Sequence, residues 1–267
     1  MNGLSQTKLD VYETADYIRS FDLALLTETR CEESDVFRGY SKLSLPLVNP
    51  GAAGEGTCVL VHPRLQGSVS LWKLQPEAQA VWVRVRASGI GLGRDVFVAC
   101  VYIPPAGSAQ LLSHSLSERM GSLKAAVTSA QAHGHVILGG DFNAKVGGMD
   151  DVLVPDRQLL EGSGIPCQRG CSHPSVNLHG HLLVDLCLAT STLLGTGRVP
   201  GDAHAPANFS RGSLESRLDH FIISRDVFSS VSQVACQLFD SDHKPVLLTV
   251  LLHDTAAAAA NDSTRPA

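Results

Sequence analysis

Acidic, amide, hydroxyl and histidine side chains recur where apolar runs of this sequence begin or end. They are Glu28, Tyr102, Asp141, Asn143, Asp219, Asp242 and His243. Carboxylates bind hard metal ions and activate water, and histidine and neutral donors can contact phosphate oxygens. A set of these types, drawn from many segments, is what metal-assisted hydrolysis of a phosphodiester requires.

The carboxylates and the histidine can divide this chemistry. Glu28 can hold Mg²⁺, which prefers oxygen ligands, and Asp141 can orient or deprotonate the attacking water. His243 can contact the scissile phosphate as imidazolium if a carboxylate such as Asp219 holds it. The charge that grows on the phosphate oxygens would be neutralised by the metal.

Two neutral donors complete the set. Asn143 and Tyr102 can bind a developing oxyanion without adding charge. Each residue alone has a simpler explanation: a solvated turn residue, an Asx turn at Asp141-Phe142-Asn143, or punctuation before a strand. Together in one chain, the features are hard to explain as coincidence.

The elements that must position these residues follow from hydrophobic periodicity. Strands are predicted at residues 22–27, 57–62, 68–74, 78–86, 95–103, 135–139, 218–224 and 245–252, and helices at 5–20, 108–132 and 182–188. Residues 147–170, and those from the last helix to Arg217, have the composition of loops. Strands with interspersed helices predict two packed sheets covered by helices, whose strand ends converge on one site.

Composition sets limits on the class of protein. The 267 residues carry a net charge of −5, which argues against binding nucleic acid by blanket phosphate neutralisation. No run approaches the ~18 apolar residues of a membrane span, and the N-terminus lacks a secretory pattern, so we expect an intracellular protein without a membrane partner. The seven cysteines are expected to be free thiols.

A cluster of cysteine and histidine residues raises the alternative of a zinc site. Cys167, Cys171, His173, His179 and His181 lie close together in sequence. Their spacing matches no familiar zinc motif, so incidental loop donors are the preferred explanation.

Five segments resemble, in order and spacing, the signatures of the endonuclease/exonuclease/phosphatase family. They are LLTETR (25–30), VYIPP (101–105), GGDFNAKVG (139–147), RLDHFIIS (217–224) and SDHKPV (241–246). The resemblance implies an α/β fold, a four-layer sandwich with two central mixed sheets flanked by helices. One domain over residues 1–253 is the simplest account of the pattern, and the low-complexity, alanine-rich tail at 254–267 is expected to be disordered.

The resemblance also implies residue roles and a Mg²⁺ or Mn²⁺ cofactor. The implied catalytic residues are Asp141, Asn143, Asp219, His243 and Tyr102, and the implied metal-site residues are Glu28, Asp242 and, more weakly, Asn2. Within the family, segments 177–187, 196–202 and 208–220 look like the endonuclease domains of LINE-type retrotransposons. Those domains nick DNA to prime reverse transcription.

This subgroup implies a DNA partner and, from that substrate, a nuclear site of action. Candidate contacts to DNA are Arg198, Ser210, Arg211 and Arg217. The subgroup also implies a reverse transcriptase domain in the parent element as a partner, and we expect that domain to be absent from this chain.

The chain departs from the family at its start. The family begins with a strand that carries an Asn, whereas this chain opens at Asn2-Gly3-Leu4, so the first strand is expected to be missing. In addition, Asn208 stands where many relatives have Thr. Two alternatives follow: an inactive truncated relic that at most binds DNA, or a phosphatase or phosphodiesterase of the same scaffold that acts on a small phosphoester.

Overall fold

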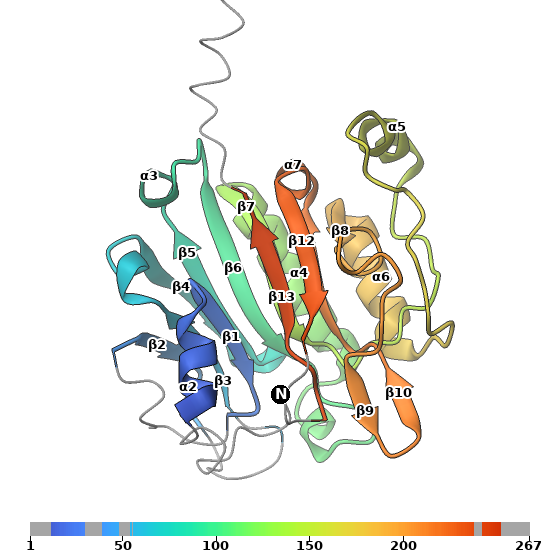
Figure 1. Ribbon diagram of the computed structural model, residues 1–267. Helices are drawn as coiled ribbons and strands as arrows, with labels where there is room; N and C mark the ends of the chain where they lie inside the picture. Colours follow the sequence, from blue (N-terminus) through green and yellow to red (C-terminus); the bar gives the residue numbers. More distant parts are fainter. Residues whose placement is uncertain (1–11, 30–38, 48–53, 55, 238–241, 252–267) are drawn as a thin grey trace, which may run out of the picture.

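A six-stranded mixed sheet is the centre of the computed structural model, which describes residues 12–29, 39–47, 54, 56–237 and 242–251 (Figure 1). Its strand order is β4-β5-β6-β7-β11-β8, with β6 and β7 parallel and the other neighbours antiparallel. The strands are β4 (Val69–Gln75), β5 (Ala80–Val85), β6 (Asp95–Tyr102), β7 (Gly134–Asp141), β8 (Thr192–Leu194) and β11 (Asp219–Ser224).

Two long helices cover one face of this sheet. They are α4 (Leu116–Gln131) and α6 (Leu178–Thr190), which Figure 1 shows behind the sheet. Ser115 begins α4 with a capping box, because its hydroxyl accepts from the Glu118 amide while the Glu118 carboxylate accepts from Ser115 N. Buried side chains such as Leu123 and Leu183 pack against Trp82 and Leu138 of the sheet.

Two smaller sheets cover the other face. One has the order β1-β3-β2, and the other pairs β12 with β13. The bounds are β1 (Leu23–Thr27), β2 (Ser41–Ser44), β3 (Thr57–Val61), β12 (Val231–Cys236) and β13 (Val246–Val250). Aliphatic side chains from both layers, among them Val59, Val83, Ile137, Ile223 and Val234, form a second core. The α/β class with helices around packed sheets is confirmed, and the expected second sheet is present as two separate sheets.

Shorter elements connect these layers. They are α2 (Tyr12–Arg19), α3 (Ala87–Ile90), α5 (Val154–Gly162), α7 (Arg225–Phe228), β9 (Phe209–Arg211), β10 (Leu214–Ser216) and the 3₁₀ turns η2 (Pro63–Leu65), η3 (Pro76–Ala78) and η4 (Ala109–Leu112). Within the described residues, no helix has both the length and the apolar character that crossing a membrane needs.

Several expectations need correction. The predicted loop 147–170 contains the helix α5, whose Pro155 and Asp156 in the first turn are a helix-start signal that the loop-like composition obscured. The predicted loop up to Arg217 contains three short strands, β8, β9 and β10, and β12 was not predicted at all. The expected missing first strand, Asn2 and the tail 254–267 lie outside the described residues.

Candidate active site

Three neighbouring strands of the six-stranded sheet place polar residues at the same level. Tyr102, the last residue of β6, is in register with Asp141, the last residue of β7. Asp141 is in turn the register partner of Asp219, the first residue of β11. Directly opposite residues on adjacent strands lie only ~5 Å apart and share a face of the sheet. Strand register therefore brings these three predicted site residues together.

Two glycines let β7 carry Asp141 into this position. A Cβ at Gly139 would collide with the side chains of Leu25 and Phe221. A Cβ at Gly140, where φ is +147°, would collide with the carbonyl group of Val101. The Gly-Gly pair before Asp141 is therefore a requirement of close strand packing.

The loop after β7 fixes the Asp141 carboxylate. Oδ1 of Asp141 accepts a hydrogen bond from the Asn143 amide at 2.8 Å, which is the Asx turn considered from the sequence. Asn143 adopts a φ of +48°, and its Nδ2 donates to Ile103 O at 2.9 Å and to Asp141 Oδ2 at 3.3 Å. The Asn143 side chain thus holds Asp141 and the end of β6 together. The Asx turn is therefore part of the candidate site and not an alternative to it.

An aspartate–histidine pair faces Asp141. Asp219 Oδ2 accepts from His243 Nδ1 at 2.8 Å, and His243 Nε2 lies 4.0 Å from Asp141 Oδ2. Asn208 steadies the pair: its Nδ2 donates to Asp219 Oδ2, and its Oδ1 accepts from Leu218 N at 2.8 Å. His243 is buried, so its orientation is determined by this hydrogen-bond chain.

The β9–β10 hairpin places His243 from the other side. Phe209 forms a bridge with His243, and their rings lie edge to face with centroids 4.9 Å apart. Next along the chain, Ser210 N donates to Asp242 O at 2.8 Å. Arg211, at the end of β9, is exposed. This hairpin therefore projects from the edge of the site.

The three titratable groups have different proton affinities. Burial, followed by the charge of Asp219, raises the pKa of Asp141 to about 7. Burial also opposes ionisation of Asp219, but the charge and hydrogen bond of His243 bring its pKa below the usual value. Burial alone would lower the pKa of His243, and the charge and hydrogen bond of Asp219 together with the charge of Asp141 raise it above its usual value. One site thus holds an ionised carboxylate and a carboxyl that can take a proton near neutral pH.

The chemistry of the donors fits a divalent cation. Asp141, Asp219 and His243 each offer a ligand atom, and these atoms lie within 4.8 Å of one another, the one such group found in the part of the chain that the structure describes. The raised pKa of Asp141 marks a buried carboxyl whose negative charge His243 offsets incompletely, and a cation would complete that compensation. Hard cations take carboxylate oxygens readily.

Two further predicted metal-site residues lie outside this group of three. Glu28 is half-buried, has a φ of +52° and directly follows β1. Figure 1 shows β1 ending at the end of the molecule where β13 begins. Asp242 is half-buried beside His243. Asn2 lies outside the described residues.

The four predicted DNA contacts separate into two kinds. Arg198 is buried with its guanidinium on Asp151 at 2.6 and 2.7 Å, and Arg217 is buried against Asp202 at 3.1 Å. Both guanidinium groups are paired with buried carboxylates, so neither is available to bind a ligand. Ser210 is half-buried and Arg211 is exposed, and both lie on β9, whose Phe209 bridges to His243.

Sequence reasoning missed the residues that hold the site in place. The sequence shows Asn208 only as a replacement for Thr, yet its Nδ2 donates to Asp219 Oδ2 and its Oδ1 accepts from Asp219 N at 3.3 Å. Asn177 had not been considered, although its Nδ2 donates to Asn143 O and its Oδ1 accepts from Lys145 N, both at 2.9 Å. An Asn directly before the apolar residues of α6 is an N-cap signal that could have found Asn177.

Comparison with known proteins finds one matching family model and several similar folds. The sequence model of the Endonuclease/Exonuclease/phosphatase family matches residues 9–243. The fold resembles the endonuclease domain of TRAS1, a telomere-specific non-LTR retrotransposon, with TM-score 0.61, 17% identity and coverage of 94% of this chain and 95% of that one. It also resembles the AP endonuclease LMAP from Leishmania major (TM-score 0.63, 16% identity, coverage 92% and 84%).

A third similar structure is the 3′-5′ exonuclease NExo from Neisseria meningitidis (TM-score 0.58, 14% identity, coverage 91% and 95%). NExo has also been solved as a 3′ phosphatase bound to a product DNA hairpin. No curated protein matches this chain by sequence. At these identities the structural likeness establishes the fold alone.

Proposed function

Because this chain belongs to the endonuclease/exonuclease/phosphatase family, we propose that it is a divalent-metal-dependent phosphodiesterase that nicks DNA. One observation carries the proposal. His243 lies between two carboxylates, with Nδ1 held by Asp219 at 2.8 Å and Nε2 4.0 Å from Asp141. Hydrolysis of a phosphodiester needs a proton acceptor and a positively charged donor next to each other. Asp141 supplies the acceptor, and the His243 imidazolium, held by Asp219, supplies the donor.

The residues divide the reaction between them. Asp141 Oδ2 orients the attacking water and accepts a proton from it. His243, with Nδ1–H fixed on Asp219, donates Nε2–H to a phosphate oxygen in the transition state. When bound, Mg²⁺ or Mn²⁺ would neutralise charge on the phosphate oxygens, with Asp141, Asp219, Glu28 and Asp242 as the candidates to hold it.

The β9–β10 hairpin favours DNA over a small phosphoester. It contacts His243 through Phe209 and carries the exposed Arg211 and the half-buried Ser210 beside the site. A guanidinium and a hydroxyl there can contact backbone phosphates on either side of the scissile bond. Nicking of the retrotransposon type is the specific reaction that we propose, because the fold resembles the TRAS1 endonuclease domain.

Nicking of supercoiled plasmid by the purified protein tests the proposal. The reactions contain Mg²⁺, Mn²⁺ or a chelator, with His243→Ala and Asp141→Asn in parallel. We expect metal-dependent nicking that falls by about 10²–10⁴-fold in both variants. The matched control is His133→Ala, since His133 is exposed and precedes β7 at the opposite end of the strand from Asp141.

Two results would contradict the proposal. Folded protein that binds DNA but nicks no plasmid with either metal would indicate the inactive relic. Hydrolysis of a 3′-phosphorylated oligonucleotide without plasmid nicking would indicate the phosphatase alternative; NExo, which has a similar fold, is a 3′ phosphatase.

A further inference from the structure

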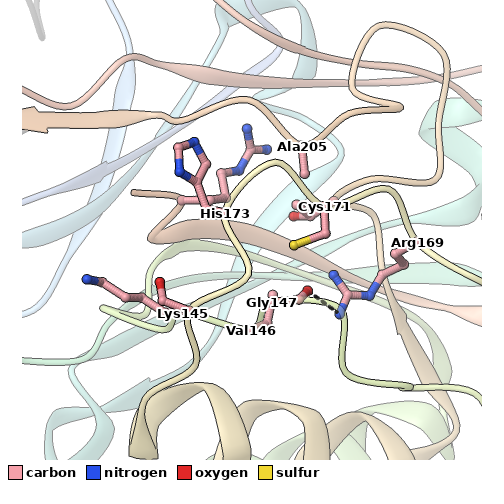
Figure 2. Close-up of a pocket in the computed structure, with 10 residues that line it drawn as sticks. Lys145, Val146, Gly147, Arg169, Cys171, His173 and Ala205 are labelled. Carbon is pink, nitrogen blue, oxygen red and sulfur yellow. Dashed lines mark hydrogen bonds between the residues drawn. The ribbon is translucent and has the colours of Figure 1, made fainter. Parts of the chain in front are cut away.

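A pocket lies next to the candidate active site, at the point where the loop after β7 meets the segment before α6 (Figure 2). Val146 pairs with Val176 in an isolated bridge, and Gly147 packs against the backbone of Pro174. The pocket is lined by Lys145, Arg169, Cys171, His173, Ser175 and Arg217, among others. It begins two residues beyond Asn143.

The pocket is rigidly attached to the catalytic loop. Asn177 accepts from Lys145 N at 2.9 Å and from Gly180 N at 2.8 Å, and it donates to Asn143 O at 2.9 Å. A Cβ at Gly180 would collide with the Lys145 carbonyl, so the glycine allows α6 to approach the loop this closely. The backbone of Lys145 is therefore held at a fixed place relative to Asn143.

The charge of the pocket is positive in a chain whose net charge is −5. Three cationic residues and one histidine line it, and no carboxylate does. Two of the cations are already neutralised, because Arg169 is paired with Asp151 at 3.1 Å and Arg217 with Asp202 at 3.1 Å. Lys145 is half-buried and forms no ion pair with any described residue. Among these three cationic residues, the Lys145 ammonium is therefore the one available to pair with an anion.

His173 accompanies Lys145. It is half-buried, lines the same pocket and lies with Lys145 in the left half of the view in Figure 2, while Arg169 lies on the right. The zinc alternative for His173 and Cys171 finds no support, because none of the described residues around them forms a metal-binding group. His179, another member of that motif, is buried with Nε2 2.9 Å from the carbonyl oxygen of Pro104.

We propose that Lys145 and His173 bind a backbone phosphate of the DNA strand next to the scissile phosphodiester. The inference rests on the proposed function, and it adds a positioning site to it. An ammonium group and an imidazole, on two segments that Asn177 and the Val146–Val176 bridge hold together, can bind a phosphate by charge and hydrogen bonding. Such a contact fixes the register of the strand, so that a single phosphodiester reaches Asp141 and His243.

Salt-dependent DNA binding tests the inference. Affinity of a labelled duplex is measured by fluorescence anisotropy in chelator, over a series of salt concentrations, for wild type, Lys145→Gln, Lys145→Arg and His173→Gln. Each neutralised phosphate contributes about 0.9 to the slope of log affinity against log salt. We expect Lys145→Gln to lower the slope by about one unit, Lys145→Arg to retain it and His173→Gln to weaken binding. The matched control Lys124→Gln, on the exposed surface of α4, should leave slope and affinity unchanged.

The outcomes separate this inference from the proposed function. Wild-type nicking together with an unchanged slope in Lys145→Gln would overturn the phosphate site and leave the endonuclease proposal standing. Wild type that neither binds nor nicks DNA would overturn both. Inorganic phosphate, added at constant ionic strength, tests whether the pocket binds free phosphate instead of a DNA backbone phosphate. Stabilisation by phosphate that depends on Lys145, without a slope change on DNA, would assign the pocket to free phosphate and overturn the DNA contact.

Discussion

At the scale of single residues, the site depends on the different environments of two carboxyls on adjacent strands. Asp141 loses hydration and faces the charge of Asp219, so its pKa rises to about 7. Asp219 is compensated by His243 and by the Asn208 amide, so its pKa stays low. Because the two carboxyls titrate differently, one can act as the proton acceptor while the other orients His243.

The pH dependence of nicking tests this division of roles. Burial lowers the pKa of His243 and Asp219 raises it, so His243 stays protonated to higher pH than a free imidazole. Activity that requires the imidazolium is present below this pKa and is lost as pH rises through it. In Asp219→Asn the raising charge is gone, and we expect the alkaline limb of kcat/KM to move to lower pH. The profile is measured on nicked plasmid.

The same experiment contains its control. Lys124→Gln should retain the wild-type profile, because its side chain lies on the exposed surface of α4. An unmoved alkaline limb in Asp219→Asn would mean that another group sets the pH dependence and that His243 is not held as proposed.

At the scale of elements, α6 is coupled to the catalytic loop through one side chain. Asn177 is the N-cap of α6, with φ −127° and ψ 175°, and its Oδ1 accepts from Gly180 N. The same side chain also hydrogen-bonds to the backbone of Asn143 and Lys145. A helix start and a loop position therefore depend on the same residue.

Two substitutions at this position separate stability from positioning. Asn177→Ala removes the cap and should cost about 1 kcal/mol, which lowers Tm by ~2–4 °C in a chain of this size. Asn177→Asp keeps an oxygen that caps the helix but loses the Nδ2 donor to Asn143 O. We expect near-wild-type Tm for Asn177→Asp with reduced nicking, measured by thermal melting and plasmid assay. Wild-type nicking by Asn177→Asp would show that the donor is not needed.

At the scale of the whole molecule, a buried ion cluster ties distant loops to the sheet. Asp151 binds Arg198 at 2.6 and 2.7 Å and Arg169 at 3.1 Å, and it also accepts from Leu194 N at 2.9 Å. All three charged side chains are almost fully buried. The cluster joins the segment before α5, the segment before α6 and the start of the loop after β8.

Arg198 and Arg211 are therefore expected to behave differently although both were predicted to contact DNA. Arg198→Ala leaves Asp151 partly uncompensated and should lower the free energy of unfolding by on the order of 3–5 kcal/mol, with a large fall in Tm. Arg211→Ala should leave Tm unchanged and weaken DNA binding. Melting curves and anisotropy on both variants check this. An unchanged Tm for Arg198→Ala would return Arg198 to the candidate DNA contacts.

The sequence alone determined the residue types on which the proposed chemistry rests and indicated the strands that end in Tyr102 and Asp141 or begin with Asp219. One apolar run ends just before Asp141-Phe142-Asn143 and another ends near Tyr102, and both indicated the ends of strands. Such runs can be recognised because the hydrophobic period and the residue types of a segment reflect its local burial. The resemblance to the family was also carried by the five signature segments of the sequence. The helix α5 was missed because the loop-like composition around it obscured its start signal at Pro155 and Asp156. The strand β12 was missed because its pairing with β13 comes from tertiary structure and its short run shows no clear alternation.

Only the tertiary structure decided which of these residues meet. Register across β6, β7 and β11 places Tyr102, Asp141 and Asp219 at one level, and such pairing between distant segments cannot be read from either segment by itself. Burial likewise made Arg198 a structural ion-pair partner and left Arg211 exposed, although the sequence presents both as arginines in loops. The charge of a side chain follows from its type, whereas its availability to a ligand depends on what the fold places around it.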